Sequence, residues 1–417
     1  MPLTVLLNMI VKNEAHIIEK TLTMLCDKIK FSYWVISDTG STDTTKDIII
    51  EFFKKRGIEG ELFDDDWKDF GHNRTKALEH AYGKSDLLFI FDADDDLVGN
   101  FKVPKKIYDS YYLKFGSGYS INYWRICMVN NRKKWKYVGV IHEYIECLES
   151  PVNKFNIEGE YYIIHGTSGD RSNDHKKYGK DAAILEKAFK ELDVKDKLRN
   201  RYAFYCANSY RDSGEVDRAI VWYKIAINLD GGWDQEKYKA CTLLHDIYKK
   251  KDKHEDAMFY ALQSYKFDKT RVEGIYRLVN FYCISEMYHV AFAYYSLISE
   301  WYENIYMKSG SNFSDKLFVE IMDYDLQLPY YLIIVAIKVG KPEVGIKMYD
   351  FLFRKKKIDV RDPFIHDILH NFQFITSAID KTNIAFISHA KDYIMALEGA
   401  NIPVNAVFKN IIDGFTL

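Results

Sequence analysis

Long apolar runs, paired cysteines and an excess of one charge are all missing from this sequence of 417 residues. The longest late apolar run, Tyr330–Ile337, is far below the roughly 20 residues of a spanning helix, so no membrane span is expected. The six cysteines form no C-x-x-C pair, which argues against a zinc knuckle or a disulfide framework and favours a reducing, cytoplasmic location. A net charge of −2 gives no field that would attract nucleic acid.

Proline is also scarce, with seven residues, which leaves little room for extended disordered linkers. The apolar fraction of 47% and the charged fraction of 28% are those of a globular protein. Single cores seldom grow past roughly 250–300 residues, so the length predicts two domains.

Apolar runs and helical patterns alternate over the first hundred residues, which predicts a mostly parallel α/β sheet. The expected strands are Thr4–Ile10, Tyr33–Ile36, Glu61–Phe63 and Leu87–Phe91. Ligands bind at the carboxyl edge of such sheets. Strand-like pieces from Tyr119 to Ile164, around a turn at Asn130-Asn131 with Trp135–Ile141 returning, predict a mixed extension of the sheet.

From Asp174 onward nearly every segment has a helical pattern, and a spaced motif recurs. A tyrosine, a small residue nine positions later and a third residue four further on occur at 210/219/223, 248/257/261 and 282/291/295. A degenerate copy is Ala336/Gly345/Tyr349. The spacing resembles the tetratricopeptide repeat, in which small residues let paired helices pack closely. We therefore expect domains at residues 1–172 and 173–417.

An acidic cluster, Asp92–Asp96, directly follows the apolar segment Phe89–Phe91. Carboxylates crowded at the end of a buried strand are costly unless a cation neutralises them. Mn²⁺ or Mg²⁺ would bridge such oxygens to a diphosphate. The alternative is a solvated acidic turn.

Three further segments precede this cluster in order: Ile10–Glu14 (IVKNE), Ser37–Thr45 (SDTGSTDTT) and Phe70–Leu78 (FGHNRTKAL). Together with FDADDD they resemble the inverting family 2 glycosyltransferases of the GT-A fold. That resemblance implies a Rossmann-like mixed-sheet GT-A domain, followed here by an all-α, tetratricopeptide-like domain. The sequence lacks the Gln-x-x-Arg-Trp motif of processive synthases.

The resemblance also implies roles for single residues. The donor-binding set would be Asn13, Glu14, Asp38, Asp43, Arg74, Asp92 and Ala93. The metal would be held by Asp92 and Asp94. Asp43 would support its loop, although Asp38 and Asp43 can also be explained as a helix-capping turn before residues 44–56.

A segment from Trp135 to Glu143 (WKYVGVIHE) looks like the acceptor-side segment of a subset of this family. Inverting transfer needs one general base, and a carboxylate suits that role. Glu143 is the predicted base, with His142 as its rival or orienting partner; both could also be a polar strand end. The resemblance also implies a third metal ligand at His165, where many GT-A enzymes place one, and imidazole can complete a site begun by carboxylates. The alternative is a structural histidine.

These expectations converge on a metal-dependent transferase that moves sugar from a nucleotide diphosphate sugar, with UDP as the first candidate, to a protein or glycan acceptor. The repeats would bind a protein acceptor, order a homodimer or buttress the catalytic half. One competing hypothesis is a catalytically silent binding protein. Another is a nucleotidyltransferase, which would need a glycine-rich loop after the first strand, where the sequence has IVKNE.

Overall fold

The computed structural model describes residues 3–117, 120–169, 171, 174, 176–310, 313, 315–356, 364–380 and 382–415. The chain divides into two compact units. The first comprises Met1–Glu236 with Phe313–Val319, and the second Lys237–Asn312 with Glu320–Leu417. The domain boundary expected between residues 172 and 173 stays a prediction, and it falls where strands give way to helices.

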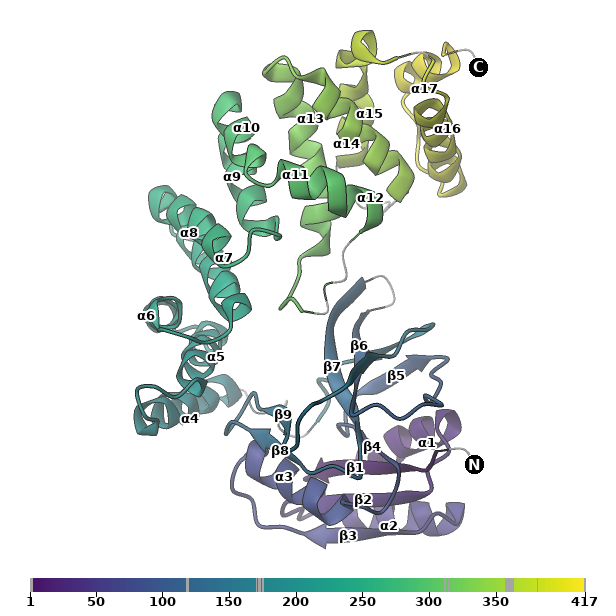
Figure 1. The fold of residues 1–417 in the computed structure, drawn as a ribbon, viewed down its shortest axis with the longest axis vertical. Coiled ribbons are helices and arrows are strands. Elements are labelled where there is room, and N and C mark those ends of the chain that lie inside the picture. Colours follow the sequence, from purple (N-terminus) through teal and green to yellow (C-terminus); the bar gives the residue numbers. More distant parts are fainter. Residues whose placement is uncertain are drawn as a thin grey trace. The chain divides into compact units, whose positions relative to one another are not determined.

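The first unit is built on one nine-stranded mixed sheet, with the order β3-β2-β1-β4-β7-β6-β11-β5 and with β10 paired to β6 (Figure 1). The four parallel strands at one side are β1 (Val5–Val11), β2 (Tyr33–Asp38), β3 (Gly60–Asp64) and β4 (Leu87–Ile90). The others are β5 (Asp96–Gly99), β6 (Ser110–Ser117), β7 (Ser120–Asn130), β10 (Lys154–Asn156) and β11 (Tyr161–Ile164). The expected mostly parallel sheet with a mixed extension is confirmed.

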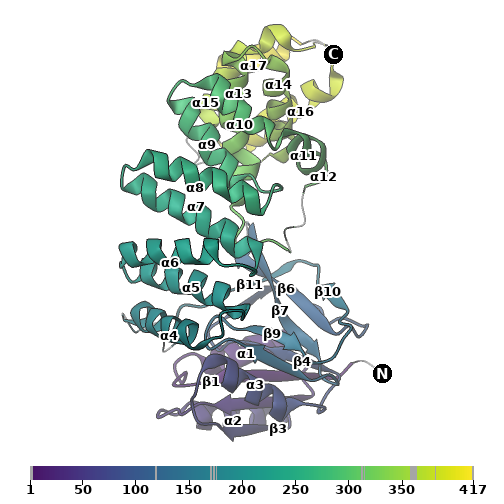
Figure 2. The same cartoon turned by 60° about the vertical axis from the view of Figure 1, so that its left-hand side comes forward.

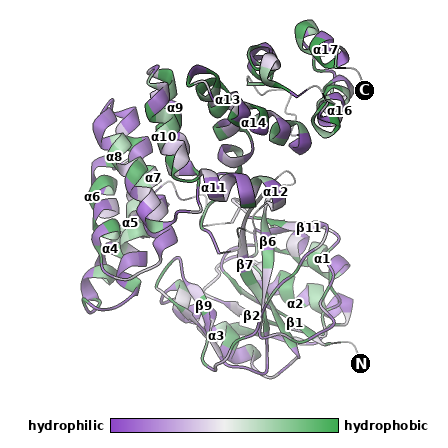
Figure 3. Ribbon diagram, turned by 45° about the horizontal axis from the view of Figure 1, so that its top comes forward, coloured by the Kyte–Doolittle hydropathy of each residue, from purple (hydrophilic) through white to green (hydrophobic). Residues whose placement is uncertain are grey.

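Alternate residues of β1 face opposite sides of this sheet, as strand geometry requires. Val5, Leu7 and Met9 belong to the core that also holds α1 (Ile18–Lys28) and α2 (Thr45–Arg56). Leu6 belongs to the second core, beneath α3 (Phe70–Ala81). Because helices cover both faces, β1 is apolar along nearly its whole length, as the colouring in Figure 3 shows.

The segment after the turn at Asn130-Asn131 differs from the expectation. β8 (Trp135–Val138) does not return to the main sheet but pairs with β9 (Tyr144–Cys147) in a separate two-stranded sheet. Trp135 and Tyr137 are buried against α3, which explains why this strand leaves the main sheet. The strands β5 and β6 were not expected from the sequence.

Helices fill the chain from residue 177 onward. Their bounds are α4 (Lys177–Glu191), α5 (Leu198–Asp212), α6 (Val216–Asn228), α7 (Asp234–Lys250), α8 (His254–Phe267), α9 (Glu273–Ile284), α10 (Tyr288–Ser296), α11 (Ser299–Trp301), α12 (Met307–Ser309), α13 (Leu328–Lys338), α14 (Pro342–Lys355), α15 (Phe364–Asn371), α16 (Ile384–Gly399) and α17 (Ala406–Asp413). Short π-helical turns cover Tyr302–Tyr306 and Asp323–Gln327. In the part of the chain that the structure describes, no helix could cross a lipid bilayer.

The repeated motif falls at matching positions of paired helices, such as α5 with α6, which lie side by side in Figure 2. Its tyrosine lies two residues before the end of the first helix, and its small residue lies in the first turns of the second. Ala219, Ala257 and Ala291 are all fully buried. Small side chains here let the two backbones approach closely, so the expected all-helical, repeat-like region is confirmed.

Substituting Ala219 by leucine is expected to lower the free energy of unfolding by about 1–3 kcal/mol, because added methylenes have no space in a packed core. Val221→Leu on the same helix adds volume at a position that is 55% exposed and serves as the control. Urea unfolding followed by circular dichroism compares the two variants. Equal midpoints would show that close packing at Ala219 is unimportant.

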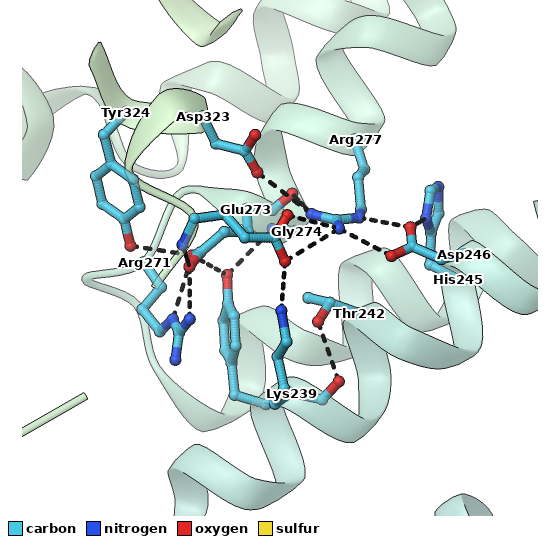
Figure 4. A network of polar contacts seen from close by, with 12 residues as sticks. Lys239, Thr242, His245, Asp246, Arg271, Glu273, Gly274, Arg277, Asp323 and Tyr324 are labelled. Atoms are coloured by element: carbon cyan, nitrogen blue, oxygen red, sulfur yellow. Dashed lines mark hydrogen bonds and ion pairs between the residues drawn. The ribbon is translucent and has the colours of Figure 1, made fainter. Parts of the chain in front are cut away.

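A buried polar network joins α7 and α9 to residues 320–324 within the second unit (Figure 4). Glu273 is fully buried, pairs with Arg271, and accepts hydrogen bonds from the hydroxyls of Tyr238 and Tyr324 at 3.1 and 3.0 Å. Such a pair stabilises a fold only when its remaining polar atoms are bonded, and the tyrosines meet that need.

Arg277 is the centre of the same network. Its guanidinium lies 3.1 Å from a carboxylate oxygen of Asp246 and 3.1 Å from one of Glu320, and 3.4 Å from one of Asp323. Burial raises the pKa of Asp323 well above its ordinary value. A raised pKa favours the neutral form of Asp323, which reduces the repulsion among the carboxylates around Arg277.

Candidate active site

The sequence-predicted residues meet at the carboxyl edge of the parallel strands. β1 lies between β2 and β4, so the loops after these three strands are neighbours. Asn13 and Glu14 follow β1, Asp38 ends β2, and the acidic cluster follows β4. The fold therefore brings together three motifs that are far apart in the sequence.

Asp38 is fully buried and shapes the loop after β2. Its Oδ1 accepts hydrogen bonds from the backbone N–H groups of Gly40 and Ser41, at 2.9 and 2.7 Å. Its Oδ2 is buried and has no hydrogen-bond partner among the described residues. A buried carboxylate oxygen without a donor is costly, which makes it a candidate acceptor for a ligand's hydroxyl or N–H.

Asn13 and Asp43 tie the loops after β1 and β2 to each other. Asn13, in the left-handed region at φ 55°, accepts a hydrogen bond through Oδ1 from the Thr42 N–H at 2.8 Å. Asp43 accepts from the N–H groups of Ala15 at 3.2 Å and Thr45 at 3.0 Å. Desolvation acts to raise the pKa of Asp43, but the hydrogen bond from the Thr45 hydroxyl, together with these backbone hydrogen bonds, outweighs it and lowers that pKa. Asp43 is thus placed both to cap α2 and to support the neighbouring loop.

Arg74, in α3, contacts carboxylates from two different segments. Its Nη2 lies 2.6 Å from Asp92 Oδ1, and its Nε lies 2.8 Å from Glu143 Oε1. The second contact is an ion pair without the alignment of a hydrogen bond. Arg125, on β7, contacts Asp92 Oδ2 at 3.2 Å. Burial acts to raise the pKa of Asp92, but the two arginines hold it well below its usual range.

Asp94 and Glu14 face the space beside Gly169. A Cβ added at Gly169 would lie 3.1 Å from Asp94 Oδ2 and 3.3 Å from Glu14 Oε1. Gly166 also approaches the Asp94 backbone so closely that a Cβ would lie 1.8 Å from its carbonyl oxygen. Glycine at these positions therefore lets the chain pass close to the Asp94 backbone and to the two carboxylates.

His165 is oriented by Asp95, which is almost fully buried. The His165 Nδ1 lies 3.1 Å from Asp95 Oδ1, and the Gly166 N–H donates to the same oxygen at 2.9 Å. Through this hydrogen bond Asp95 raises the pKa of His165. Carboxylates commonly hold metal-binding histidines in this way, leaving the other ring nitrogen for the ligand.

The predicted metal ligands supply only part of a cation site among the described residues. No three His, Cys, Asp or Glu residues within the described ranges are close enough to form a metal site by themselves. Mg²⁺ characteristically takes one or two carboxylates and fills its other positions with substrate phosphates and water. Asp94 supplies one carboxylate of this kind. His165 directly precedes Gly166, which approaches the Asp94 backbone. Both oxygens of Asp92 already contact arginines.

Glu143 ends the five-residue loop from Gly139 to Glu143 that joins β8 to β9. Its side chain is 11% exposed. His142 adopts a φ of 53°, is exposed, and stacks on the Tyr205 ring with centroids 4.1 Å apart. Desolvation by the surrounding protein, followed by nearby cations including Arg201, lowers the pKa of His142 well below its ordinary value. His142 is therefore neutral at physiological pH.

Two contributors were not expected from the sequence. Arg125 is a single cation in an otherwise uncharged strand, and Asp95 stands inside an acidic run with nothing to distinguish it from its neighbours. Ala93, expected near the donor, has a buried side chain, and its carbonyl accepts a hydrogen bond from Thr21 Oγ1 at 2.6 Å. A role for Ala93 at the donor stays a prediction.

Comparison with known proteins finds a family model that matches part of the first unit. Residues 8–101 match the family model described as Glycosyl transferase family 2, which places a glycosyltransferase domain there. The resemblance drawn from the motifs is confirmed for these residues, and the segments around Glu143 and His165 lie beyond the match. No curated protein sequence matches the chain.

Solved structures similar to the chain include glycosyltransferases and a repeat protein. The mannosyltransferase PcManGT from Pyrobaculum calidifontis, in complex with GDP-Man and Mn²⁺, is 11% identical with a TM-score of 0.32, covering 63% of this chain and 87% of that one. A tetratricopeptide repeat protein from Parabacteroides merdae is 10% identical, with a TM-score of 0.32 and coverages of 57% and 92%. TarS 1-349 of S. aureus, in complex with UDP-GlcNAc, is 12% identical, with a TM-score of 0.28 and coverages of 74% and 95%.

Proposed function

With a family 2 glycosyltransferase domain at residues 8–101 as the premise, we propose that the chain catalyses metal-dependent, inverting transfer from a nucleotide diphosphate sugar to a protein or glycan hydroxyl. The observation that carries the proposal is the position of Arg74. It contacts Asp92, from the donor motif, and Glu143, the predicted base. Arg74 would therefore link the carboxylate at the donor site to the carboxylate that serves the acceptor.

Donor binding would use the loops after β1, β2 and β4. The buried Oδ2 of Asp38 would accept a hydrogen bond from the base or ribose, which supports its predicted role. Asn13, Glu14 and Asp43 belong to the loops around this position. UDP remains the first candidate nucleotide because of its frequency in the family.

The diphosphate would lie near Asp94, beside the space that Gly169 leaves. Asp94 would hold Mn²⁺ or Mg²⁺, and His165 would be a second ligand. Asp92 is the other carboxylate of the predicted metal motif. When bound, this ion would neutralise the charge that develops on the leaving diphosphate. Arg74 and Arg125 would keep Asp92 ionised and in place.

Glu143 would act as the general base in a single displacement. Its carboxylate takes the acceptor hydroxyl's proton as the acceptor oxygen forms a bond to the anomeric carbon. The bond from that carbon to the diphosphate oxygen breaks, and its electron pair leaves with the nucleotide diphosphate. Attack from the face opposite the leaving group inverts the anomeric centre. His142, neutral and next in sequence, remains the rival base or the partner that orients Glu143.

A nucleotide panel tests the proposal. UDP, GDP, CMP and their common sugar conjugates, each with Mn²⁺, Mg²⁺ or a chelator, are added in a thermal-shift assay, because a ligand that binds only the native state stabilises it. We expect one nucleotide class to raise the melting temperature only with metal, and its sugar conjugate to be consumed. A metal-dependent shift without consumption would favour the catalytically silent binding protein, and no shift at all would contradict a donor site.

The helical region would bind a protein acceptor, form a homodimer or buttress the catalytic part. All six cysteines are unpaired, which supports a reducing location such as the cytoplasm. Size-exclusion chromatography with light scattering distinguishes a dimer from a monomer.

A further inference from the structure

The loop that carries Glu143 is held on one side by α3 of the catalytic domain. The Phe70 N–H donates a hydrogen bond to the Val140 carbonyl at 3.1 Å. Gly71 lies so close to this loop that a Cβ would be 2.2 Å from the Gly139 carbonyl oxygen. Arg74, one turn further along α3, contacts the Glu143 carboxylate.

The other side of the loop is held by α5, a helix that the sequence assigns to the repeats. The Val140 N–H donates to the Tyr202 hydroxyl at 3.0 Å, and Arg201 Nε donates to the His142 carbonyl at 2.8 Å. Tyr205 stacks on the His142 ring with an interplanar angle of 12°. Three side chains from α5 thus contact the Gly139–Val140 peptide group, the His142–Glu143 peptide group and the His142 ring.

These contacts explain how the loop keeps a conformation that it would not hold alone. His142 has a positive φ, which costs about 1 kcal/mol or more for a residue other than glycine unless its surroundings fix it. Arg201 is fixed in turn by Glu236, which is 2% exposed and lies 2.7 Å from Arg201 Nη1. The anchor therefore combines a buried carboxylate, Glu236, with Arg201, whose side chain is 20% exposed, and both lie within the first compact unit.

We infer that Arg201 and Tyr202 of α5 are positioning residues, which hold the loop from Gly139 to Glu143 so that the Glu143 carboxylate meets the acceptor. This inference rests on the proposed function, because it takes Glu143 as the base. The helical region then has a direct part in turnover, and donor binding does not depend on it. Neither residue contacts the loops after β1, β2 or β4 in any described interaction.

The test compares Tyr202→Phe with Tyr210→Phe. The first removes the hydroxyl that binds the Val140 N–H and keeps the ring; the second removes a hydroxyl from the same helix that bonds Glu186 instead. Hydrogen–deuterium exchange of the peptide containing residues 139–143 reports on the loop, and steady-state kinetics with the donor from the nucleotide panel report on catalysis. Arg201→Met and the conservative Arg201→Lys form a second pair.

Tyr202→Phe is expected to speed exchange in residues 139–143 and to lower kcat about 10- to 100-fold with the donor KM unchanged, because the part-buried Val140 N–H loses its partner. Tyr210→Phe should match wild type in both assays, and Arg201→Lys should retain more activity than Arg201→Met. Unchanged exchange, or faster exchange with full kcat, would overturn the inference. Faster exchange in a protein whose wild type consumes no donor would support the positioning contact and contradict the proposed function instead.

Discussion

Replacing Glu143 with glutamine is expected to reduce sugar transfer by about 10²- to 10⁴-fold, the usual contribution of a general base. The amide has nearly the same shape but cannot accept the acceptor's proton. It also removes the charge that faces Arg74 Nε at 2.8 Å, while the contact of Arg74 with Asp92 remains. Donor binding should therefore persist. Initial transfer rates and nucleotide-induced thermal shifts measure the two effects separately.

Glu146→Gln is the matched control for this variant. Glu146 lies three residues further along, on β9, and its carboxylate is exposed beside Lys136. Its substitution should leave both assays at wild-type values. If Glu143→Gln transferred sugar at the wild-type rate, the base would have to be another group, and His142 would be the first to test by His142→Gln.

Asp94→Asn is expected to abolish the metal-dependent part of nucleotide binding and to lower turnover by about 10³-fold or more. A bound cation contributes several kcal/mol to stabilising transition-state charge, and each 1.36 kcal/mol is tenfold in rate. Asparagine retains an oxygen of the same reach but loses the charge that binds a hard cation. Thermal shifts with UDP, measured with Mn²⁺ and with chelator, should become equal in this variant.

Asp96→Asn provides the comparison within the same acidic run. Asp96 begins β5, and its carboxylate is 43% exposed beside Lys20, with Oδ1 3.4 Å from the lysine nitrogen. Loss of this solvent-screened pair should change stability by less than about 1 kcal/mol and leave metal dependence intact. Full turnover in Asp94→Asn would remove the metal assignment, whatever happens in Asp96→Asn.

The strands β1, β2 and β4 could be predicted because they are buried on both faces. Apolar runs such as Thr4–Ile10 mark β1 clearly, and polar motifs follow at the strand ends. β6 gave no such signal, since Ser110–Ser117 mixes serine and lysine with aromatic residues. β8 gave a strand signal but no indication of its partner, because burial against α3 decided its place.

The site was predictable where one motif contains the residue, and not where two distant segments meet. Asp92 and Asp94 were recognisable from FDADDD. The pairing of Asp92 with Arg125 spans 33 residues, and that of Asp95 with His165 spans 70. Tyr202 carried no catalytic signal at all, because a buried tyrosine at helical spacing indicates a core position before it indicates anything else.

The short segment Phe313–Val319 sets a limit on how this protein could have been assembled. It belongs to the first unit, where the Phe318 ring lies 6.2 Å from that of Tyr123 on β7, yet both of its flanks belong to the second unit. The chain therefore passes between the units three times. A gene fragment that ends at Glu236 would encode a first unit without this segment, so domain shuffling by a single cut could neither remove nor exchange the helical part cleanly.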